Sequence, residues 1–216
     1  MDRTCVTKLL NMVLVVSLLV GIGCASSDST FKKAEGVSSV KPGSVAVISG
    51  SSSEVDIRLS EEVTRLLFEK SKFKVLNQDE ITKSIPEYPM YFMESQPTDV
   101  EKGTINQSYL TEKNQSTINK MQEKLKVQYV ILVWTTGITA LVSASGSNVI
   151  NDVYWIYVPV RVVSYPDKKV VAFTNAKIRG SYIRFRSLNN ATHKLLTEAA
   201  EEIVDSFLEM TEGGKI

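Results

Sequence analysis

Short apolar runs alternate with helix-spaced apolar stripes along most of the chain. The runs at residues 44–49 and 129–134 are rich in β-branched side chains, which is typical of strands buried on both faces. Residues 57–69, 112–125 and 188–210 carry apolar side chains at steps of three and four, which predicts three amphipathic helices. We therefore expect a fold that mixes strands with helices.

Shorter patterns lie between these elements in the sequence. Residues 73–76 alternate and predict a second strand, while Asn77 with Glu80 three residues later predicts a capping box at the start of a short helix. Residues 86–111 differ in kind because they hold three prolines and a polar stretch around Gly103. We expect this segment to be a long insertion between regular elements.

The C-terminal half predicts a long hairpin. Residues 153–164 alternate, the Pro–Asp pair within residues 165–168 suits a tight turn, and residues 170–185 form the returning strand. Residues 137–152 are small and polar around an apolar centre. A membrane-inserting hairpin would need two strands of about 9–11 residues with an outward apolar face. An ordinary loop or a strand extension is therefore favoured at that place.

The order of the predicted elements is β-α-β-α-insertion-α-β-β-β-α. Interleaved strands and helices of this kind predict an α/β fold, with a single mixed sheet flanked by helices and a C-terminal amphipathic helix. We expect this domain to span residues 44–216, with the insertion at about residues 86–111.

An apolar run near the N-terminus predicts export. A helix over residues 9–22 would rise about 21 Å, short of a hydrocarbon core of roughly 30 Å, so the run predicts a secretory signal peptide. It ends at Gly23 and Cys24, which resembles the bacterial lipobox, where small residues precede a cysteine that becomes acylated. We expect residues 1–23 to be a lipoprotein signal peptide. An ordinary signal peptide and an uncleaved anchor are the alternatives.

Residues 24–43 predict a flexible tether, because their only large apolar side chains are Phe31, Val37 and Val40. Each buried methylene is worth about 0.8 kcal/mol, so acyl chains on Cys24, palmitate among them, would hold the domain on a membrane. Ala25 stands where an Asp would be the inner-membrane retention signal of enteric bacteria. We therefore expect attachment to the outer membrane, on its periplasmic side.

Charge and composition exclude several classes of protein. The chain of 216 residues holds 25 Lys and Arg against 24 Asp and Glu, and removal of residues 1–23 leaves a net charge of zero. Without a basic surplus, a nucleic-acid partner is not expected. Loss of Cys5 with the signal peptide leaves Cys24 as the one cysteine, so no intramolecular disulfide can form.

We do not expect this protein to be an enzyme. The sequence predicts no catalytic residues, no metal site and no cofactor. The single imidazole, His193, rules out a multi-histidine metal site, and its place at the start of the last helix predicts a solvated side chain. Gly50 and the three serines after it form only a weak match to a phosphate-binding loop.

One cluster suggests a partner-binding surface. Aromatic and methionine side chains are enriched in the cores of interfaces. The candidates are Tyr88, Met90, Tyr91, Phe92 and Met93. A loop packed over the domain's own sheet explains the same cluster equally well.

Four segments together resemble a group of bacterial envelope domains. Residues 45–48 match the first strand of that group, residues 73–81 (FKVLNQDEI) its second strand and helix, and residues 125–132 and 158–171 its later strands. The chain is similar, as a distant member, to the fold shared by the curli-secretion lipoprotein CsgG, the penicillin-binding-protein activator LpoB and the N-terminal domain of TolB. The resemblance implies an envelope role without catalysis.

Two functions from different classes follow. The first is a lipid-anchored periplasmic domain that binds or assembles other envelope components. The alternative is a subunit of a ring-forming outer-membrane secretion or transport assembly, which would make the protein a homo-oligomer. A third function, an enzyme such as a hydrolase, would need a pocket of convergent polar groups that the sequence does not show.

Overall fold

A computed structural model of the protein describes residues 29–37, 39–88, 110–136, 138–143, 151–165, 167–183 and 188–211. The strands are β1 (Lys32–Lys33), β2 (Ser44–Ser49), β3 (Lys74–Val75), β4 (Tyr129–Val133), β5 (Ile138–Ser143), β6 (Asn151–Ser164) and β7 (Lys169–Ile183). The helices are α2 (Glu54–Lys70), α3 (Gln78–Ser84), α4 (Glu112–Leu125) and α5 (Leu188–Met210). In the part of the chain that is described, no helix is long and apolar enough to cross a bilayer.

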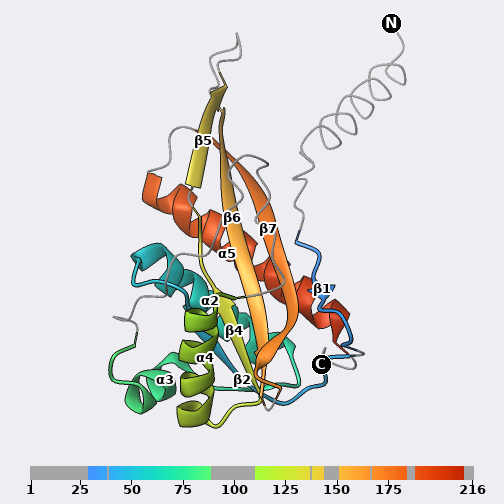
Figure 1. The fold of residues 1–216 in the computed structure, drawn as a ribbon. Coiled ribbons are helices and arrows are strands. Elements are labelled where there is room, and N and C mark those ends of the chain that lie inside the picture. Colours follow the sequence, from blue (N-terminus) through green and yellow to red (C-terminus); the bar gives the residue numbers. More distant parts are fainter. Residues whose placement is uncertain are drawn as a thin grey trace, which may run out of the picture.

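The seven strands of the described residues belong to one mixed sheet. The order is β1-β7-β6-β4-β2-β3, with β5 paired to β6 (Figure 1). The strand β2 pairs in parallel with β3 and β4, whereas β6 pairs antiparallel with β4, β5 and β7. The predicted α/β class with a single mixed sheet is confirmed.

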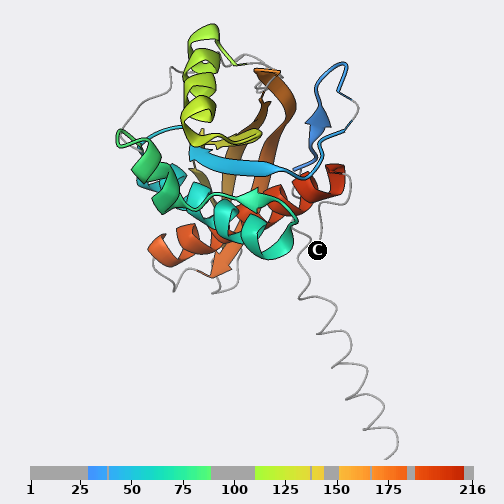
Figure 2. The ribbon, with the colours of Figure 1, turned by 90° about the horizontal axis from the view of Figure 1, so that it is seen from below.

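Helices cover both faces of the sheet. Figure 2 shows α4 on one side and α2 with α5 on the other. The core under α2 and α5 includes Leu67 and Phe207, and the core under α4 includes Ile118 and Met121, with Ile81 from α3. The predicted C-terminal amphipathic helix therefore supplies much of one core, because its apolar stripe lies against the sheet.

Local sequence signals place the helix ends. The Asn77 side chain accepts from the Glu80 N–H at 2.8 Å, and the Glu80 carboxylate accepts from the Asn77 N–H at 2.9 Å, so the predicted capping box is confirmed. Ser53 caps α2 in the same way by accepting from the Asp56 N–H at 3.1 Å. The helix α4 ends at Leu125, and its C-cap residue Lys126 has a φ of 55°.

The strand β5 continues the path of β4 along β6, so of the two alternatives for this part of the chain, a loop or a strand extension, residues 138–143 form a strand. Val133 pairs with Val160 and Ile138 pairs with Ile156, so the path from β4 to β5 holds one more residue than the facing part of β6. Such an extra residue makes a β-bulge, which bends a strand and increases its twist.

Beyond this bulge the sheet narrows to a projecting arm. We define the arm as β5 with residues 151–159 of β6 and residues 175–183 of β7. The strand β4 pairs with β6 only from Ser164 to Val160, so the arm extends past the body of the sheet (Figure 1).

The segment before β2 differs from the predicted tether. The strand β1 pairs with β7, and Phe31 and Val40 are buried with 8% and 1% of their surface exposed. The Phe31 ring lies 5.6 Å from the Phe207 ring of α5. A few apolar side chains are enough for this docking because Phe31 packs against α5 and Val40 is buried in the same core. The domain therefore extends back at least to Ser29 and does not begin at residue 44.

Replacement of Phe31 tests this docking. We expect Phe31→Ala to lower the free energy of unfolding by about 3 kcal/mol, because it removes a buried ring from the core. Urea unfolding followed by circular dichroism measures the change. Lys32→Ala is the control, since Lys32 is exposed on β1 and should stay within about 0.5 kcal/mol of the wild type. Equal stability of the two variants would instead support a free tether.

Candidate functional site

The arm carries aromatic and cationic side chains on one face. Tyr157 pairs with Lys177 and Trp155 pairs with Arg179, and directly paired residues of neighbouring strands share a face. Asn175 lies on the same face beside Lys177 on β7, and it is exposed. We call these five residues the arm face. The opposite face of β6 carries core residues such as Ile156 and Val158.

The two cations of the arm face lie over its rings. The Lys177 Nζ is 4.2 Å from the centre of the Trp155 ring and 5.5 Å from that of Tyr157. The Arg179 guanidinium carbon is 5.5 Å from the Trp155 ring. These are cation–π distances, which hold the charges in place without neutralising them. Among the described residues, neither cation has a carboxylate within ion-pair distance.

A third cation lies buried at the foot of the arm face. Arg161 is 1% exposed, and its guanidinium carbon lies 5.5 Å from the Trp134 ring and 5.6 Å from the Phe173 ring. Its Nη1 donates to two backbone carbonyls at 2.8 and 3.0 Å, and its Nη2 donates to Asn175 Oδ1 at 3.0 Å. Burial lowers the pKa of the Arg161 guanidinium to about 10. Arg161 thereby fixes the orientation of an arm-face side chain, Asn175.

The charged side chains of the arm face are all basic. Among the positions of β5, β6 and β7 on this face that the structure describes, none is Asp or Glu. Sequence analysis missed the arm face, because it treated residues 153–164 only as an alternating strand. The available signal was the alternation itself, which places Trp155, Tyr157 and Arg161 on one side of the strand.

A buried carboxylate fixes the point where the arm leaves the body. Asp56, in the first turn of α2, is 2% exposed and accepts from the Thr135 N–H at 2.8 Å and from the Thr135 hydroxyl at 2.7 Å. The Ser51 hydroxyl donates to its other oxygen. Because Thr135 lies in the bulge between β4 and β5, Asp56 satisfies a backbone donor that the sheet leaves without a strand partner.

Gly50 lies against the same bulge. Its N–H donates to the Val133 carbonyl at 2.7 Å, and a Cβ on Gly50 would lie 2.8 Å from the Cβ of Trp134. Only glycine allows this approach without a shift. The Asp56 carboxylate occupies the polar space between this loop and the bulge. The loop therefore holds an anion of the protein's own, which disfavours its weak match to a phosphate-binding loop.

Tyr88, a predicted partner-binding residue, is buried with 4% of its surface exposed. Its hydroxyl accepts from the Ser49 N–H at 3.2 Å and donates to Gln78 Oε1 at 3.0 Å. Burial raises the pKa of the Tyr88 phenol above its ordinary value of about 10. Tyr88 is thus a core residue that joins α3 to β2, and its assignment to a partner-binding surface is corrected.

The other predicted site residues lie outside the described residues. They are Cys24, Met90, Tyr91, Phe92 and Met93. His193 is exposed on α5, as expected for a solvated side chain. Within the described ranges, no group of three or more His, Cys, Asp or Glu side chains is placed to hold a metal ion.

Removal of the Asp56 carboxylate tests its role at the bulge. We expect Asp56→Ala to lower the free energy of unfolding by about 2–4 kcal/mol, because the Thr135 N–H loses its buried acceptor. Glu54→Ala is the matched control, since Glu54 is also acidic, lies in the same first turn and is exposed. It should change stability by no more than about 0.5 kcal/mol. Urea unfolding measures both, and similar losses in the two variants would contradict a special role for Asp56.

The pH dependence of unfolding tests the burial of Tyr88. The folded protein keeps the phenol proton at a pH where the unfolded chain loses it, so this group's contribution to stability is present below about pH 10 and falls as the pH rises through the folded pKa. We expect the stability difference between the wild type and Tyr88→Phe to be constant from about pH 7 to 9 and to shrink above about pH 10. A difference that stays constant up to about pH 11, in urea titrations at each pH, would contradict this burial.

Comparisons with known proteins give only distant likenesses. No protein-family model and no curated protein matches the sequence. A single-substitution variant of the PelC dodecamer from Paraburkholderia phytofirmans is 8% identical, covers 85% of this chain and 99% of its own, and has a TM-score of 0.42. Lipoprotein GNA1162 from Neisseria meningitidis is 13% identical, covers 76% and 99%, and also has a TM-score of 0.42. The hypothetical protein CT253 from Chlamydia trachomatis is 14% identical, covers 79% and 98%, and has a TM-score of 0.41.

These likenesses are too distant to assign a family or a function to this chain. The resemblance of the sequence to CsgG, LpoB and the TolB N-terminal domain stays a prediction.

Proposed function

We propose that this protein is a non-catalytic binding module of the bacterial cell envelope. In this proposal Cys24 carries the lipid that anchors the chain to the periplasmic side of the outer membrane, and the arm face holds another envelope component. The observation that carries the proposal is the arm face itself, with Trp155, Tyr157, Lys177 and Arg179 gathered on one projecting piece of sheet.

The arm face has the properties of a prepared binding surface. Its side chains stand on paired strands and not on a loop, so their spacing is set by the sheet. Cation–π contacts hold both charges in position, which reduces the ordering that a ligand would have to impose. Aromatic and Arg side chains are also the residues that dominate binding energy in interfaces.

The envelope location in this proposal rests on the N-terminal sequence. The apolar run at residues 9–22 and the lipobox-like end at Cys24 support export followed by acylation. A net charge of zero for the chain after residue 23 gives no general electrostatic attraction to an anionic membrane, so attachment would depend on acyl chains.

Site-specific crosslinking in intact cells tests the binding role. A photoreactive amino acid replaces Tyr157 on the arm face or, as the control, Phe68 on α2, which is the most exposed large apolar side chain of the described residues at 73%. We expect adducts from position 157 in the outer-membrane fraction and few from position 68. With Cys24→Ala in addition, the protein should leave that fraction and the adducts should be lost.

Equal adduct patterns from the two positions would contradict a binding role for the arm face. An unmodified Cys24 in the mature protein, measured by mass spectrometry of the N-terminal peptide, would contradict the lipid anchor. The mass spectrum tests the lipid anchor directly, whereas the comparison of positions 157 and 68 tests the arm face in the protein that carries Cys24.

A second candidate function is a subunit of a ring-forming outer-membrane assembly. The observation that favours it is the arm, because β5 pairs with β6 alone among the described strands and leaves its other edge without a strand partner. Such an edge can accept a strand from another copy of the chain. Adducts from position 157 at twice the mass of the protein would favour this function over the first.

A further inference from the structure

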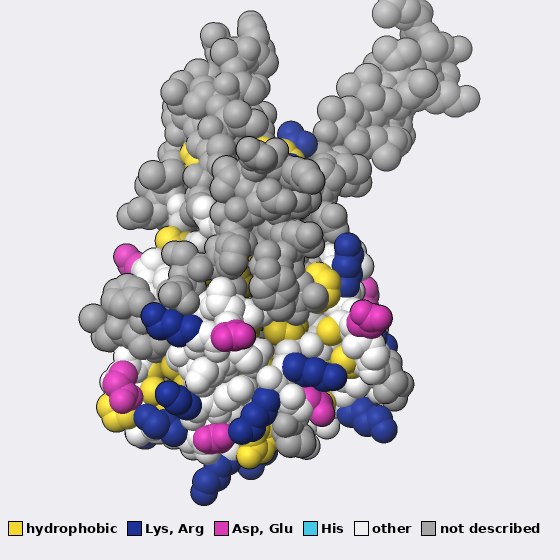
Figure 3. Space-filling view, in the orientation of Figure 1, with side chains coloured by type: hydrophobic (Ala, Val, Ile, Leu, Met, Phe, Trp, Pro, Cys, Tyr) yellow, Lys and Arg dark blue, Asp and Glu magenta, His cyan; other side chains and the backbone are white. Residues whose placement is uncertain are grey.

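The arm face differs from the rest of the described surface in what its cations contact. In the body, some exposed cations lie beside carboxylates, as in the pairs Lys124–Glu87 at 3.8 Å and Lys168–Glu123 at 3.0 Å, and others, such as Lys74, lie beside none of the described carboxylates. Figure 3 shows basic and acidic side chains interspersed over the lower half of the molecule. Lys177 and Arg179 have no such partner among the described residues, and their contacts are with aromatic rings.

A group of cations on one face is costly without an anionic partner. Lys177 and Arg179 are half-buried, and Arg161 at the foot of the face is fully buried with a lowered pKa. Like charges on one face repel each other, and burial removes the water that would screen them. An anion bound at the arm face would relieve this repulsion, so the face is complementary to negative charge.

The spacing of the charges suits a linear polymer. Successive side chains on one face of a strand are roughly 6.6–6.8 Å apart, so Lys177 and Arg179 form a row along β7 and Trp155 and Tyr157 form a parallel row along β6. A chain with acidic groups at a similar interval can place them against the cations. The apolar faces of its sugar rings can then contact the neighbouring aromatic rings.

Exposure argues against a membrane as the occupant. Insertion into a bilayer needs several exposed apolar side chains on one surface. The large apolar side chains that are exposed among the described residues are Phe68, Tyr157 and Tyr165, which lie on α2, the arm and the β6–β7 turn. They form no common apolar patch, and Tyr157 at 37% is the only one on the arm face.

We propose that the arm face binds an acidic polysaccharide, with Lys177 and Arg179 contacting its carboxylate or phosphate groups and with Trp155 and Tyr157 contacting its sugar rings. This inference rests on the proposed binding role and names the class of partner. Arg161 acts as a positioning residue, since its donation to Asn175 Oδ1 fixes how the Asn175 amide is turned at the foot of the face.

Binding of defined polymers to the full-length protein in detergent tests the proposal. The probes are polygalacturonate, which carries carboxylates, phosphorylated dextran, which carries phosphates, and plain dextran, which is neutral. Vesicles of phosphatidylglycerol report binding to an anionic membrane. We expect one or both acidic polymers to bind at least about tenfold more tightly than dextran, in calorimetry at low salt.

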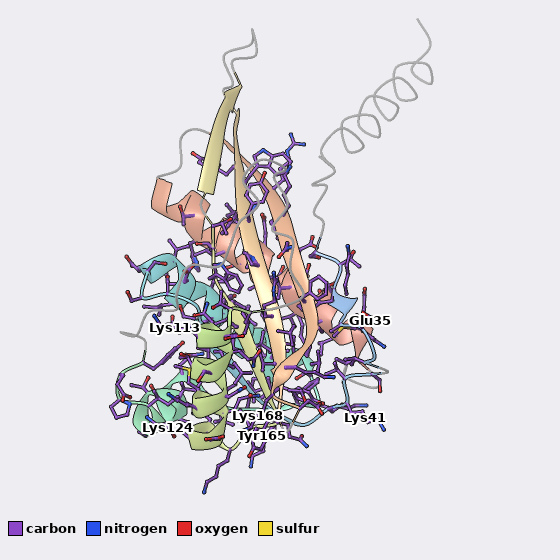
Figure 4. All side chains as sticks on the ribbon, viewed as in Figure 1. Glu35, Lys41, Lys113, Lys124, Tyr165 and Lys168 are labelled. Carbon is purple, nitrogen blue, oxygen red and sulfur yellow. The ribbon has the colours of Figure 1, made fainter. Side chains whose placement is uncertain are left out.

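A matched pair of double variants locates the site. Lys177→Gln with Arg179→Gln should weaken binding of the acidic polymer at least about tenfold. Lys124→Gln with Lys168→Gln removes the same charge near the other end of the molecule, where Figure 4 labels both residues, and should change binding less than about threefold. Equal weakening in the two double variants would overturn the proposal, because it would show a response to net charge alone.

A measurement on the wild type covers the case in which the arm variant fails to fold. Lysine acetylation followed by mass spectrometry compares Lys177 with Lys124 in the presence and absence of polygalacturonate or phosphorylated dextran. We expect protection of Lys177 and none of Lys124. No protection of Lys177, or tighter binding to phosphatidylglycerol vesicles than to either polymer, would overturn the proposal.

Failure of this inference is distinguishable from failure of the proposed function. If the acidic polymers do not bind while position 157 still gives specific adducts in cells, the arm face is a binding surface for another class of partner. If position 157 gives no specific adducts and the polymers do not bind, the binding role itself is wrong.

Discussion

The hydrogen bonds from Thr135 to Asp56 join the bulge between β4 and β5 to the first turn of α2. Without Asp56, the Thr135 N–H would have no acceptor. An unsatisfied buried donor costs free energy, so the bulge would be less stable than regular strand pairing. With Asp56 in place, the bulge is stable and β5 follows β6 at a changed angle. The path of β5 beside β6 therefore depends on one carboxylate in the first turn of α2, while the arm face itself lies on β6 and β7, which pair without interruption along the arm.

Buried apolar side chains stabilise this fold, and buried polar side chains determine how particular elements contact each other. Two apolar cores, one under α2 and α5 and one under α4, supply the burial that makes the body stable. Polar groups with full burial occur where elements must meet in one particular way, as with Asp56 at the bulge and Tyr88 between β2 and α3. Arg161 is the exception, because among the described residues its charge faces rings and carbonyls and no carboxylate. Its position beside the arm face connects this unusual burial with the surface that we propose to bind a ligand.

Local signals predicted most of the fold, and long-range contacts account for what they missed. Periodicity predicted α4 and α5 at their observed bounds, and the pairing of Asn77 with Glu80 predicted the start of α3. The arm face could not be predicted from local signals. It depends on which residue of β7 lies opposite Trp155, and this pairing register is set over the whole length of the hairpin. Tyr88 was misassigned because composition alone does not tell a buried aromatic from an exposed one. The docking of Phe31 was missed because two or three apolar residues give no period.

That docking sets how far the body can stand from its anchor. If Cys24 carries the lipid, only five peptide steps separate it from Ser29, whose hydroxyl already donates to Glu202 of α5 at 3.1 Å. A fully extended chain spans at most about 3.3–3.6 Å per residue, so the reach is no more than roughly 18 Å. A tether that continued to residue 43 would have allowed several times that contour length. The part of the body around Ser29 and Glu202 would therefore remain close to the bilayer surface.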